Sequence, residues 1–186
     1  MAKHIIVIRH GDKNGDQLTP LGESQVVAQA EQLSKKFTFT RYLSSGRNRT
    51  NQTISLAIST HQDQPGKFTV LNKFDPTDLF MSFFSEGGLF EAELAKIQEL
   101  GGTVGSAISI SEYARKARRN MITSIVAVAS DLEEGQTALV AAHGFSTEMA
   151  VPNPHEMPYG IDTADAVYYT VESEEITSAQ LIRRPV

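Results

Sequence analysis

IIVIRHG, residues 5–11, is the stretch of sequence that decides the fold. Its first four residues are all β-branched, which predicts a strand buried on both faces, as at the centre of a parallel sheet. Arg9 and His10 follow at the carboxyl end of this strand, where open α/β sheets bind their ligands. Gly11 then allows the backbone to turn tightly. An arginine beside a histidine at this edge indicates an anion site that holds a nucleophile or a base.

Length and composition indicate one globular domain covering residues 1–186. The chain is long enough to bury a core without disulfides, and its 40% hydrophobic and 21% charged residues exclude a disordered or fibrous protein. It contains no cysteine, which excludes thiolate metal sites and cysteine nucleophiles. The net charge of −5 argues against a general nucleic-acid binder. No segment resembles a leader or a membrane span, so we expect a cytoplasmic protein without a membrane partner.

The order of the expected elements favours an α/β fold with a mostly parallel sheet and helices on both faces. Thr19 and Pro20 suit the N-cap and the first position of a helix. Helices are expected at residues 20–36, 47–59, 91–100 and 111–132. Strands are expected at residues 5–8, 37–43, 68–71, 137–142, 164–171 and 179–183, with the last two antiparallel at the sheet edge. Strands that alternate with helices in this way are typical of a parallel α/β sheet.

The segment at about 72–105 departs from this alternation and is interpreted as a small insertion over the ligand edge of the sheet. It contains Pro76, phenylalanines at positions 80, 83, 84 and 90, and two pairs of glycines. Most of these aromatic side chains are expected to pack the insertion onto the domain. A lid over the site and a contact in a homodimer are two further interpretations that the sequence leaves open.

Three strand ends carry residues suited to phosphate chemistry. His10 and His143 each follow an apolar strand, and each precedes a glycine. The segment SSGRNRTNQT, residues 44–53, places arginines and backbone N–H groups at a helix N-terminus, which is a natural anion site. Strands far apart in sequence can be neighbours in a sheet, so both histidines could converge on one pocket. Two histidines with at least two arginines suit a phosphoryl group.

Four motifs in this order resemble the histidine phosphatase superfamily, also called phosphoglycerate mutase-like. They are RHG at 9–11, LTPLGESQ at 18–25, SSGRNRTNQT at 44–53 and HG at 143–144. The resemblance implies the phosphoglycerate mutase-like fold, with His10 as the nucleophile that accepts the phosphoryl group. By the same resemblance Arg9, Arg49 and His143 bind the phosphoryl oxygens, whereas Arg47 is a rim or surface residue.

The chemistry of these residues agrees with that assignment. Histidine attacks phosphorus as neutral imidazole, and its ordinary pKa near 6.5 makes this form available around pH 7. Neighbouring arginines lower the pKa further and can hold the charged equatorial oxygens of the transition state. We therefore expect neither a metal nor another cofactor. His4, His61 and His155 have no partner at metal-ligand spacing, so we expect surface or loop roles for them.

The proton donor for the leaving group is the least defined member of the site. Mutases of this superfamily have a glutamate shortly after a Leu-Asn pair, but here the pair is followed by Lys73. Asp75 is the favoured donor, and Asp78 and Glu86 are the alternatives. Asp75 and Asp78 also suit a turn or a helix cap beside Pro76. Lacking the mutase glutamate, the sequence favours a phosphatase over a mutase.

The expected function is that of a metal-independent phosphatase, a phosphoric monoester hydrolase. It would hydrolyse a phosphomonoester or a phosphohistidine through a covalent phosphohistidine on His10. One alternative is phosphoryl transfer of the phosphoglycerate mutase type. Another is a non-catalytic regulatory protein that binds a phosphorylated ligand. The partner is a phosphorylated small molecule or a phosphoprotein, and the sequence leaves both open.

Overall fold

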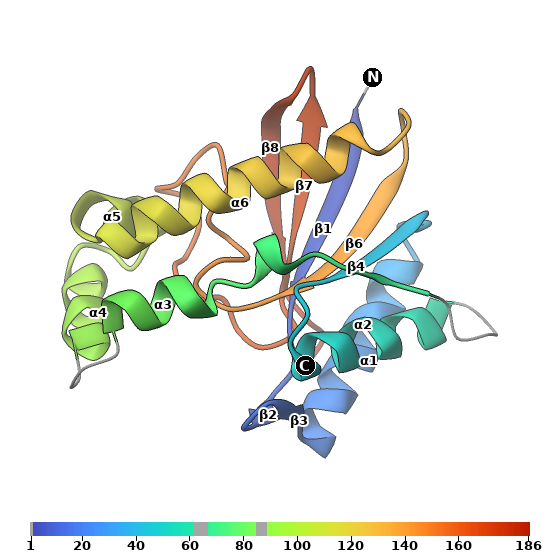
Figure 1. Ribbon diagram of the computed structural model, residues 1–186, viewed down its shortest axis with the longest axis horizontal. Helices are drawn as coiled ribbons and strands as arrows, with labels where there is room; N and C mark the ends of the chain where they lie inside the picture. The colour runs from blue at the N-terminus through green and yellow to red at the C-terminus, as the bar shows by residue number, and fades with distance from the viewer. Residues whose placement is uncertain (1, 62–66, 85–88) are drawn as a thin grey trace.

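The computed structural model describes residues 2–61, 67–84 and 89–186, and these form a six-stranded sheet between helices (Figure 1). The strands are β1 (Lys3–Arg9), β4 (Arg41–Ser44), β5 (Thr69–Val70), β6 (Thr137–Ala142), β7 (Ala166–Glu172) and β8 (Glu175–Ile182). They lie in the order β5-β4-β6-β1-β7-β8. The pairs β5–β4, β4–β6 and β6–β1 are parallel, whereas β7 and β8 are antiparallel to their neighbours. The expected α/β class and the antiparallel pair at the edge are confirmed.

Helices cover both faces of the sheet, as expected. On one face, α1 (Pro20–Ser34) and α2 (Asn48–His61) pack against Ile6 and Ile8. On the other, α6 (Glu112–Ser130) packs over Ile5 and Val7. The four β-branched side chains of residues 5–8 in β1 are fully buried. Burial of each one stabilises the fold by about 1.5–3 kcal/mol. The unbroken β-branched run therefore predicted the centre of the sheet correctly.

The loop from β1 to α1 is held by close backbone contact. It contains a small hairpin of β2 (Lys13–Asn14) and β3 (Gln17–Leu18) that the sequence did not predict. Thr19 caps α1 by accepting a hydrogen bond from the Gly22 backbone N–H at 3.1 Å. A Cβ on Gly11 would lie 2.3 Å from the carbonyl oxygen of Gly22. Glycine is therefore needed at position 11 for this close approach.

The segment at about 72–105 is more helical than expected. It contains a 3₁₀ turn (Asn72–Phe74), α3 (Thr77–Phe84) and α4 (Leu89–Glu99), and leads into α5 (Val104–Ile110). Figure 1 shows α3, α4 and α5 gathered around one end of α6. The expected helix at 91–100 corresponds to α4. Helix α3 was missed because it is only eight residues long, too short for its helical spacing to stand out from an irregular insertion.

Aromatic side chains attach this helical segment to the rest of the chain. Phe80, Phe83 and Phe84 pack against the core beside the buried Tyr113 of α6. The ring centroids of Phe80 and Tyr113 are 5.5 Å apart and perpendicular, an arrangement that aromatic quadrupoles favour. The interpretation that most of these phenylalanines pack the insertion onto the domain is confirmed.

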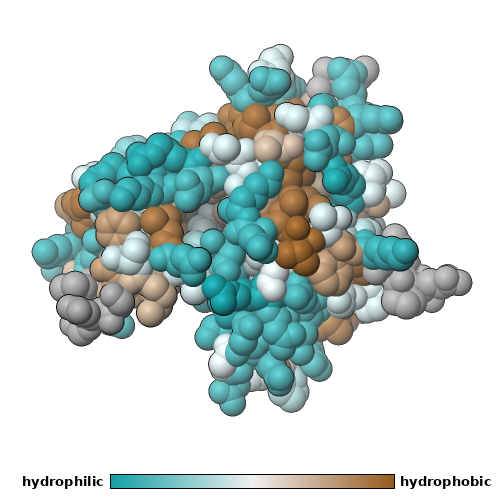
Figure 2. Space-filling model, viewed as in Figure 1, coloured by the Kyte–Doolittle hydropathy of each residue, from teal (hydrophilic) through white to brown (hydrophobic). Residues whose placement is uncertain are grey.

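The outer face of α6 is hydrophilic, as Figure 2 shows. Part of its basic run is structural, because Arg118 donates hydrogen bonds to the carbonyls of Met149 and Val151. Within the described ranges, every helix is too short or too polar to cross a bilayer.

We expect Gly11→Ala to lower the free energy of unfolding by about 3 kcal/mol, because the added methyl group must displace the backbone at Gly22. Denaturant unfolding followed by circular dichroism measures this loss. Gly15→Ala is the matched control, because its φ is +60° but its added methyl group meets nothing within 4 Å. The control should cost only about 1 kcal/mol. Equal losses in both variants would contradict the close-approach argument.

Candidate active site

The register of the parallel strands brings the expected site residues together. β6 lies between β1 and β4, with Arg9 opposite Ala142 and Ser44 opposite Ala141. The residues that follow these positions therefore emerge at one edge of the sheet. The ring centroids of His10 and His143 lie 5.5 Å apart with an angle of 68° between the planes. The expected convergence of the two histidines is confirmed.

These two histidines line one cavity together with Arg9 and Arg49. The cavity has a volume of about 310 Å³, which accommodates a phosphoryl group and part of a small leaving group. Lys13, which was not among the predicted site residues, also lines it. Four of the predicted site residues thus share one cavity, and five of its described lining residues have basic or imidazole side chains, from three separate segments.

His10 is held as a neutral imidazole with one ring nitrogen committed. Its Nδ1 lies 2.8 Å from the carbonyl oxygen of Gly11, and because a carbonyl can only accept, Nδ1 carries the proton. The lone pair is then on Nε2. Burial, together with the positive charges of Arg49 and Arg9, lowers the pKa of His10 to about 4, although the hydrogen bond to the Gly11 carbonyl opposes this shift. At pH 7 His10 is therefore unprotonated at Nε2, as a nucleophile must be.

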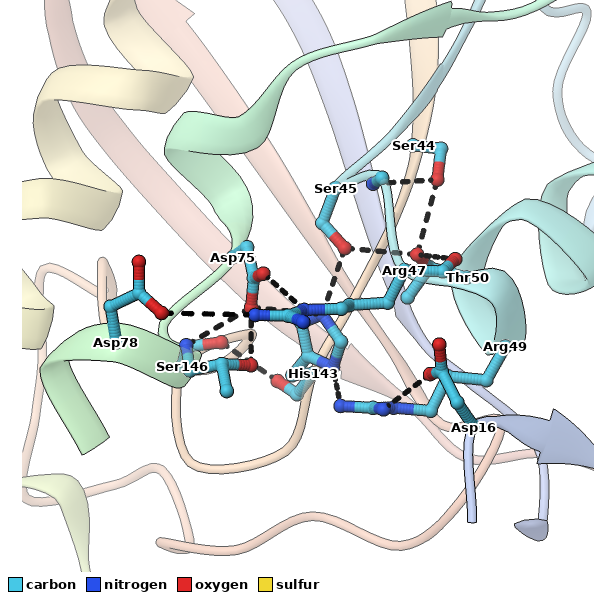
Figure 3. A network of polar contacts seen from close by, with 12 residues as sticks. Asp16, Ser44, Ser45, Arg47, Arg49, Thr50, Asp75, Asp78, His143 and Ser146 are labelled. Carbon is cyan, nitrogen blue, oxygen red and sulfur yellow. Dashed lines mark hydrogen bonds and ion pairs between the residues drawn. The ribbon is translucent and has the colours of Figure 1, made fainter. Parts of the chain in front are cut away.

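His143 is the centre of the polar network in Figure 3. Its Nδ1 accepts a hydrogen bond from Nη2 of Arg49 at 3.1 Å, so Nε2 carries the proton and donates to Oγ of Ser45 at 2.8 Å. The Ser45 hydroxyl donates in turn to Oγ1 of Thr50 at 3.0 Å. Burial and the nearby Arg49 charge lower the pKa of His143 to about 3. The ring is thus neutral, and its orientation is fixed by β4 and α2.

Both arginines keep a donor that no described group uses. Nη1 of Arg9 donates to the carbonyl of Ile161, and Nη1 of Arg49 donates to Oδ1 of Asp16 at 2.6 Å. The buried Nε atoms of both side chains have no hydrogen-bond partner within the described ranges. A buried donor without a partner is costly, so these N–H groups are suited to oxygens of an anionic ligand.

Gly144, in the loop after β6, leaves space for the side chain of Arg9. A Cβ on Gly144 would lie 2.7 Å from Cζ of Arg9, so glycine at position 144 leaves room for the guanidinium. Glycine is therefore needed after each histidine for a different steric reason: Gly11 contacts the Gly22 backbone, and Gly144 contacts the Arg9 side chain.

Asp75, the favoured proton donor, does not line this cavity with the other four residues. Its Oδ1 lies 3.6 Å from Nε2 of His143, and Nε of Arg47 donates to its Oδ2 at 2.6 Å. Burial alone would raise the pKa of Asp75, but the hydrogen bonds from Thr77 and Arg47 outweigh it and hold the pKa below its ordinary value. Asp75 is therefore ionised at pH 7 and has no proton to donate.

The other predicted donors and Arg47 have different surroundings. Asp78 is fully exposed and lies 3.8 Å from Nη2 of Arg47. Glu86 lies outside the described residues. Arg47, expected at the rim, is partly exposed and binds Asp75. This pair joins the start of α2 to the segment before α3, and nothing in the spacing of the two residues predicted it.

Glu148 is a buried acid that the sequence analysis missed. It lies in the turn after β6, and its Oε1 accepts a hydrogen bond from the Gly160 backbone N–H at 2.7 Å. Its Oε2 is buried and has no hydrogen-bond partner in the described part of the chain. Burial raises the pKa of Glu148 to about 7, although the hydrogen bond and the charge of Arg9 oppose this shift. The sequence signal that could have identified Glu148 was an isolated acidic residue shortly after the His143-Gly144 motif.

Comparisons with known proteins place the fold. No family model and no curated protein matches the sequence. The chain is similar to the solved structure of phosphoglycerate mutase from Bacillus anthracis, with 15% identity, a TM-score of 0.66 and coverage of 95% of this chain and 91% of the other. It is also similar to the protein histidine phosphatase SixA complexed with tungstate, with 18% identity, a TM-score of 0.57 and coverage of 97% and 95%.

A third similar structure is a phosphoserine phosphatase from Entamoeba histolytica in complex with phosphoserine. It has 16% identity, a TM-score of 0.63 and coverage of 98% of this chain and 96% of the other. The chain thus has the fold of the histidine phosphatase superfamily over nearly its whole length, as the four motifs implied.

Within the described residues, no group of three or more His, Asp or Glu side chains is arranged to hold a metal ion.

We expect Glu148→Gln to remove a pH dependence of stability. The pKa of Glu148 rises from 4.5 to about 7 on folding, so the native state binds the extra proton and stability falls as the pH rises from 4.5 to 7. This loss is on the order of 3 kcal/mol. Thermal unfolding of both proteins between pH 4.5 and 8 measures it.

The comparison isolates Glu148, because the buried His10 and His143 titrate in both proteins. Wild type should lose stability relative to Glu148→Gln up to about pH 7, with no further change above it. A difference that does not vary with pH would show that Glu148 has an ordinary pKa.

Proposed function

We propose that this chain is a metal-independent phosphatase that hydrolyses a phosphate monoester or a phosphohistidine through a phosphohistidine on His10. The observation that carries the proposal is the hydrogen bond between Nδ1 of His10 and the Gly11 carbonyl. It leaves the lone pair of a neutral, buried imidazole on Nε2, in a cavity that Arg9 and Arg49 also line. Binding of phosphate alone does not require a nucleophile held in this form.

In the first step, Nε2 of His10 attacks phosphorus and forms a P–N bond as the P–O bond to the leaving group breaks. The leaving oxygen takes the electron pair of that bond. Arg9 and Arg49 hold the non-bridging oxygens, where the transition state carries its charge. His143, which the sequence also assigned to these oxygens, has both ring nitrogens committed to Arg49 and Ser45, and it orients the Arg49 guanidinium. Nδ1 of His10 keeps its proton throughout, and the Gly11 carbonyl stabilises the positive charge that develops on the ring.

In the second step, water attacks the phosphohistidine on the side opposite to the ring. The P–N bond breaks, Nε2 recovers its electron pair, and one proton of the water is released as phosphate forms. The enzyme returns to the neutral histidine with which it started.

The surroundings of Asp75 support a positioning role in place of the proton donation expected from the sequence. Its carboxylate is ionised, pairs with Arg47 and lies beside His143. The two similar structures named as phosphatases agree with hydrolysis. The cytoplasmic location and the homodimer expected from the sequence remain parts of this proposal.

We expect His10→Ala to reduce phosphate release from 4-nitrophenyl phosphate by at least about a thousandfold, because the nucleophile is lost. Wild type should be equally active with and without a chelator. His155→Ala is the matched control, because His155 lies outside the cavity, against Gly105. Activity that persists in His10→Ala, or that the chelator abolishes, would overturn the proposal. Phosphate binding without turnover on any substrate would favour the regulatory alternative.

We expect the pH profile of kcat/KM to reflect the low pKa of His10. After correction for the second ionisation of the substrate near pH 6, activity should fall only as the pH approaches 4, where His10 becomes protonated. Profiles between pH 4 and 8, recorded also for Glu148→Gln, separate the titrations of the two groups. A fall centred near pH 6.5 in both proteins would contradict the buried, neutral His10.

A further inference from the structure

The cavity has a second, apolar half. This part of the lining differs in character from the histidines and arginines, because it consists of Pro76, Phe80, Tyr113 and Phe145. They come from the start of α3, from α6 and from the turn after β6. The phosphoryl group occupies the basic half in the proposed function, so the apolar half is left for the leaving group.

The aromatic rings of this wall are fixed by further rings behind them. The centroids of Phe90 and Phe145 are 5.0 Å apart, and those of Phe145 and Tyr159 are 5.1 Å apart, both at steep angles. Phe80 contacts Tyr113 at 5.5 Å. Rings held in this way lose little conformational entropy on binding, which favours contact with a flat apolar group.

Phe145 is held in a backbone conformation that a bulky residue rarely adopts. Its φ is +60°, in the left-handed region, where a side chain costs about 1–2 kcal/mol and glycine costs little. Strain of this kind is concentrated at functional sites. The chain has an aromatic ring at a position where the backbone favours glycine, and that ring lines the cavity.

The charges of the wall do not suit an acidic leaving group. Beyond the arginines and histidines assigned to the phosphoryl group, Lys13 is the one cation among the described lining residues. A leaving group that carries a carboxylate would lie against Phe80, Tyr113 and Phe145, where burial of an unpaired charge is unfavourable.

Protonation of the leaving oxygen by a carboxylic acid would require such an acid in the lining of the cavity. None of the described lining residues carries a carboxyl group, and Asp75 is ionised in its pair with Arg47. An alkyl alcohol is about as weak an acid as water, so it is a poor leaving group without a proton. A phenol has a pKa of about 10 and can leave as the anion at pH 7.

From the aromatic wall, and because none of the described lining residues carries a carboxyl group, we infer that the substrate is a phosphate ester of an aromatic alcohol, with Phe145 as a specificity-determining residue. This inference rests on the proposed phosphatase activity. The P–O bond breaks toward the ring oxygen, and the phenolate leaves with the electron pair and takes its proton from solvent. A small aryl phosphate and a phosphotyrosine side chain share this chemistry.

Binding of non-hydrolysable phosphonates tests the wall without depending on turnover. We expect phenylphosphonate to bind wild type about tenfold more tightly than propylphosphonate, and 2-carboxyethylphosphonate to bind more weakly than either, as measured by calorimetry. In Phe145→Gly, which suits the positive φ, the phenyl-to-propyl ratio should fall to within about threefold. Phe80→Leu gives a second test of the wall if Phe145→Gly does not fold.

Phe83→Leu is the matched control. Phe83 belongs to the same aromatic group, with its ring 6.2 Å from Tyr113, but it does not line the cavity. The phenyl-to-propyl ratio should therefore stay near ten in this variant. Equal binding of the three phosphonates by wild type, or an unchanged ratio in both wall variants, would overturn the inference.

Kinetics supply an independent test and distinguish a small aryl phosphate from a phosphotyrosine side chain as the substrate. We expect kcat/KM to fall steeply as the pKa of the phenol rises along a series of substituted phenyl phosphates, and to be at least a hundredfold lower for phosphoserine. A phosphotyrosine peptide that is turned over faster than phenyl phosphate identifies a protein substrate, and the reverse identifies a small aryl phosphate. Equal turnover of phosphoserine would overturn the inference.

The failure of the inference is distinguishable from failure of the proposed function. If acid-labile phosphate forms on His10 but the phosphonates bind equally, the phosphatase stands and the aromatic specificity is wrong. If phenylphosphonate is selected but no ester is hydrolysed and His10 is never phosphorylated, the phosphatase proposal is wrong, and with it the assignment of a substrate.

Discussion

The parallel pairing of β6 with β1 on one side and β4 on the other is the constraint on which the site depends. Parallel strands in register end at the same edge of the sheet, so their following residues must meet there. His10, His143 and the start of α2 are brought together by this register, although more than 130 positions separate the two histidines. A change of register by one residue would turn these side chains to the opposite face.

The electrostatics of the site follow from burying imidazoles among cations. Low pKa values keep both His10 and His143 neutral at pH 7. Acids offset the arginines from outside the cavity: Asp16 binds Arg49, and Asp75 binds Arg47. The described lining of the cavity therefore carries no negative charge, which favours binding of a phosphate dianion.

Local patterns predicted most of the fold and four of the residues that line the cavity, because the signals lie in short stretches: β-branched strands, the Thr19 cap and histidines at strand ends. Pairings between distant segments were beyond this reasoning. The Arg47–Asp75 ion pair and the burial of Glu148 depend on how loops pack, which the residue spacing does not encode. Helix α3 was missed because its eight residues are too few for periodicity to distinguish a helix from an irregular insertion, although Asp78 and Ser82 form a polar face. Asp75 was chosen as the proton donor from its position in the sequence. Its ionisation, however, is set by the hydrogen bonds that Thr77 and Arg47 donate to it.

The placement of β1 also bears on how the chain reaches its native state. Its two neighbours, β6 and β7, come from residues beyond 136, so a nascent chain exposes four adjacent β-branched apolar residues until most of its length has been synthesised. Such non-local pairing slows folding, and an unpaired apolar strand promotes aggregation. The strand that leads into His10 is thus a segment that binding by a chaperone would protect during synthesis.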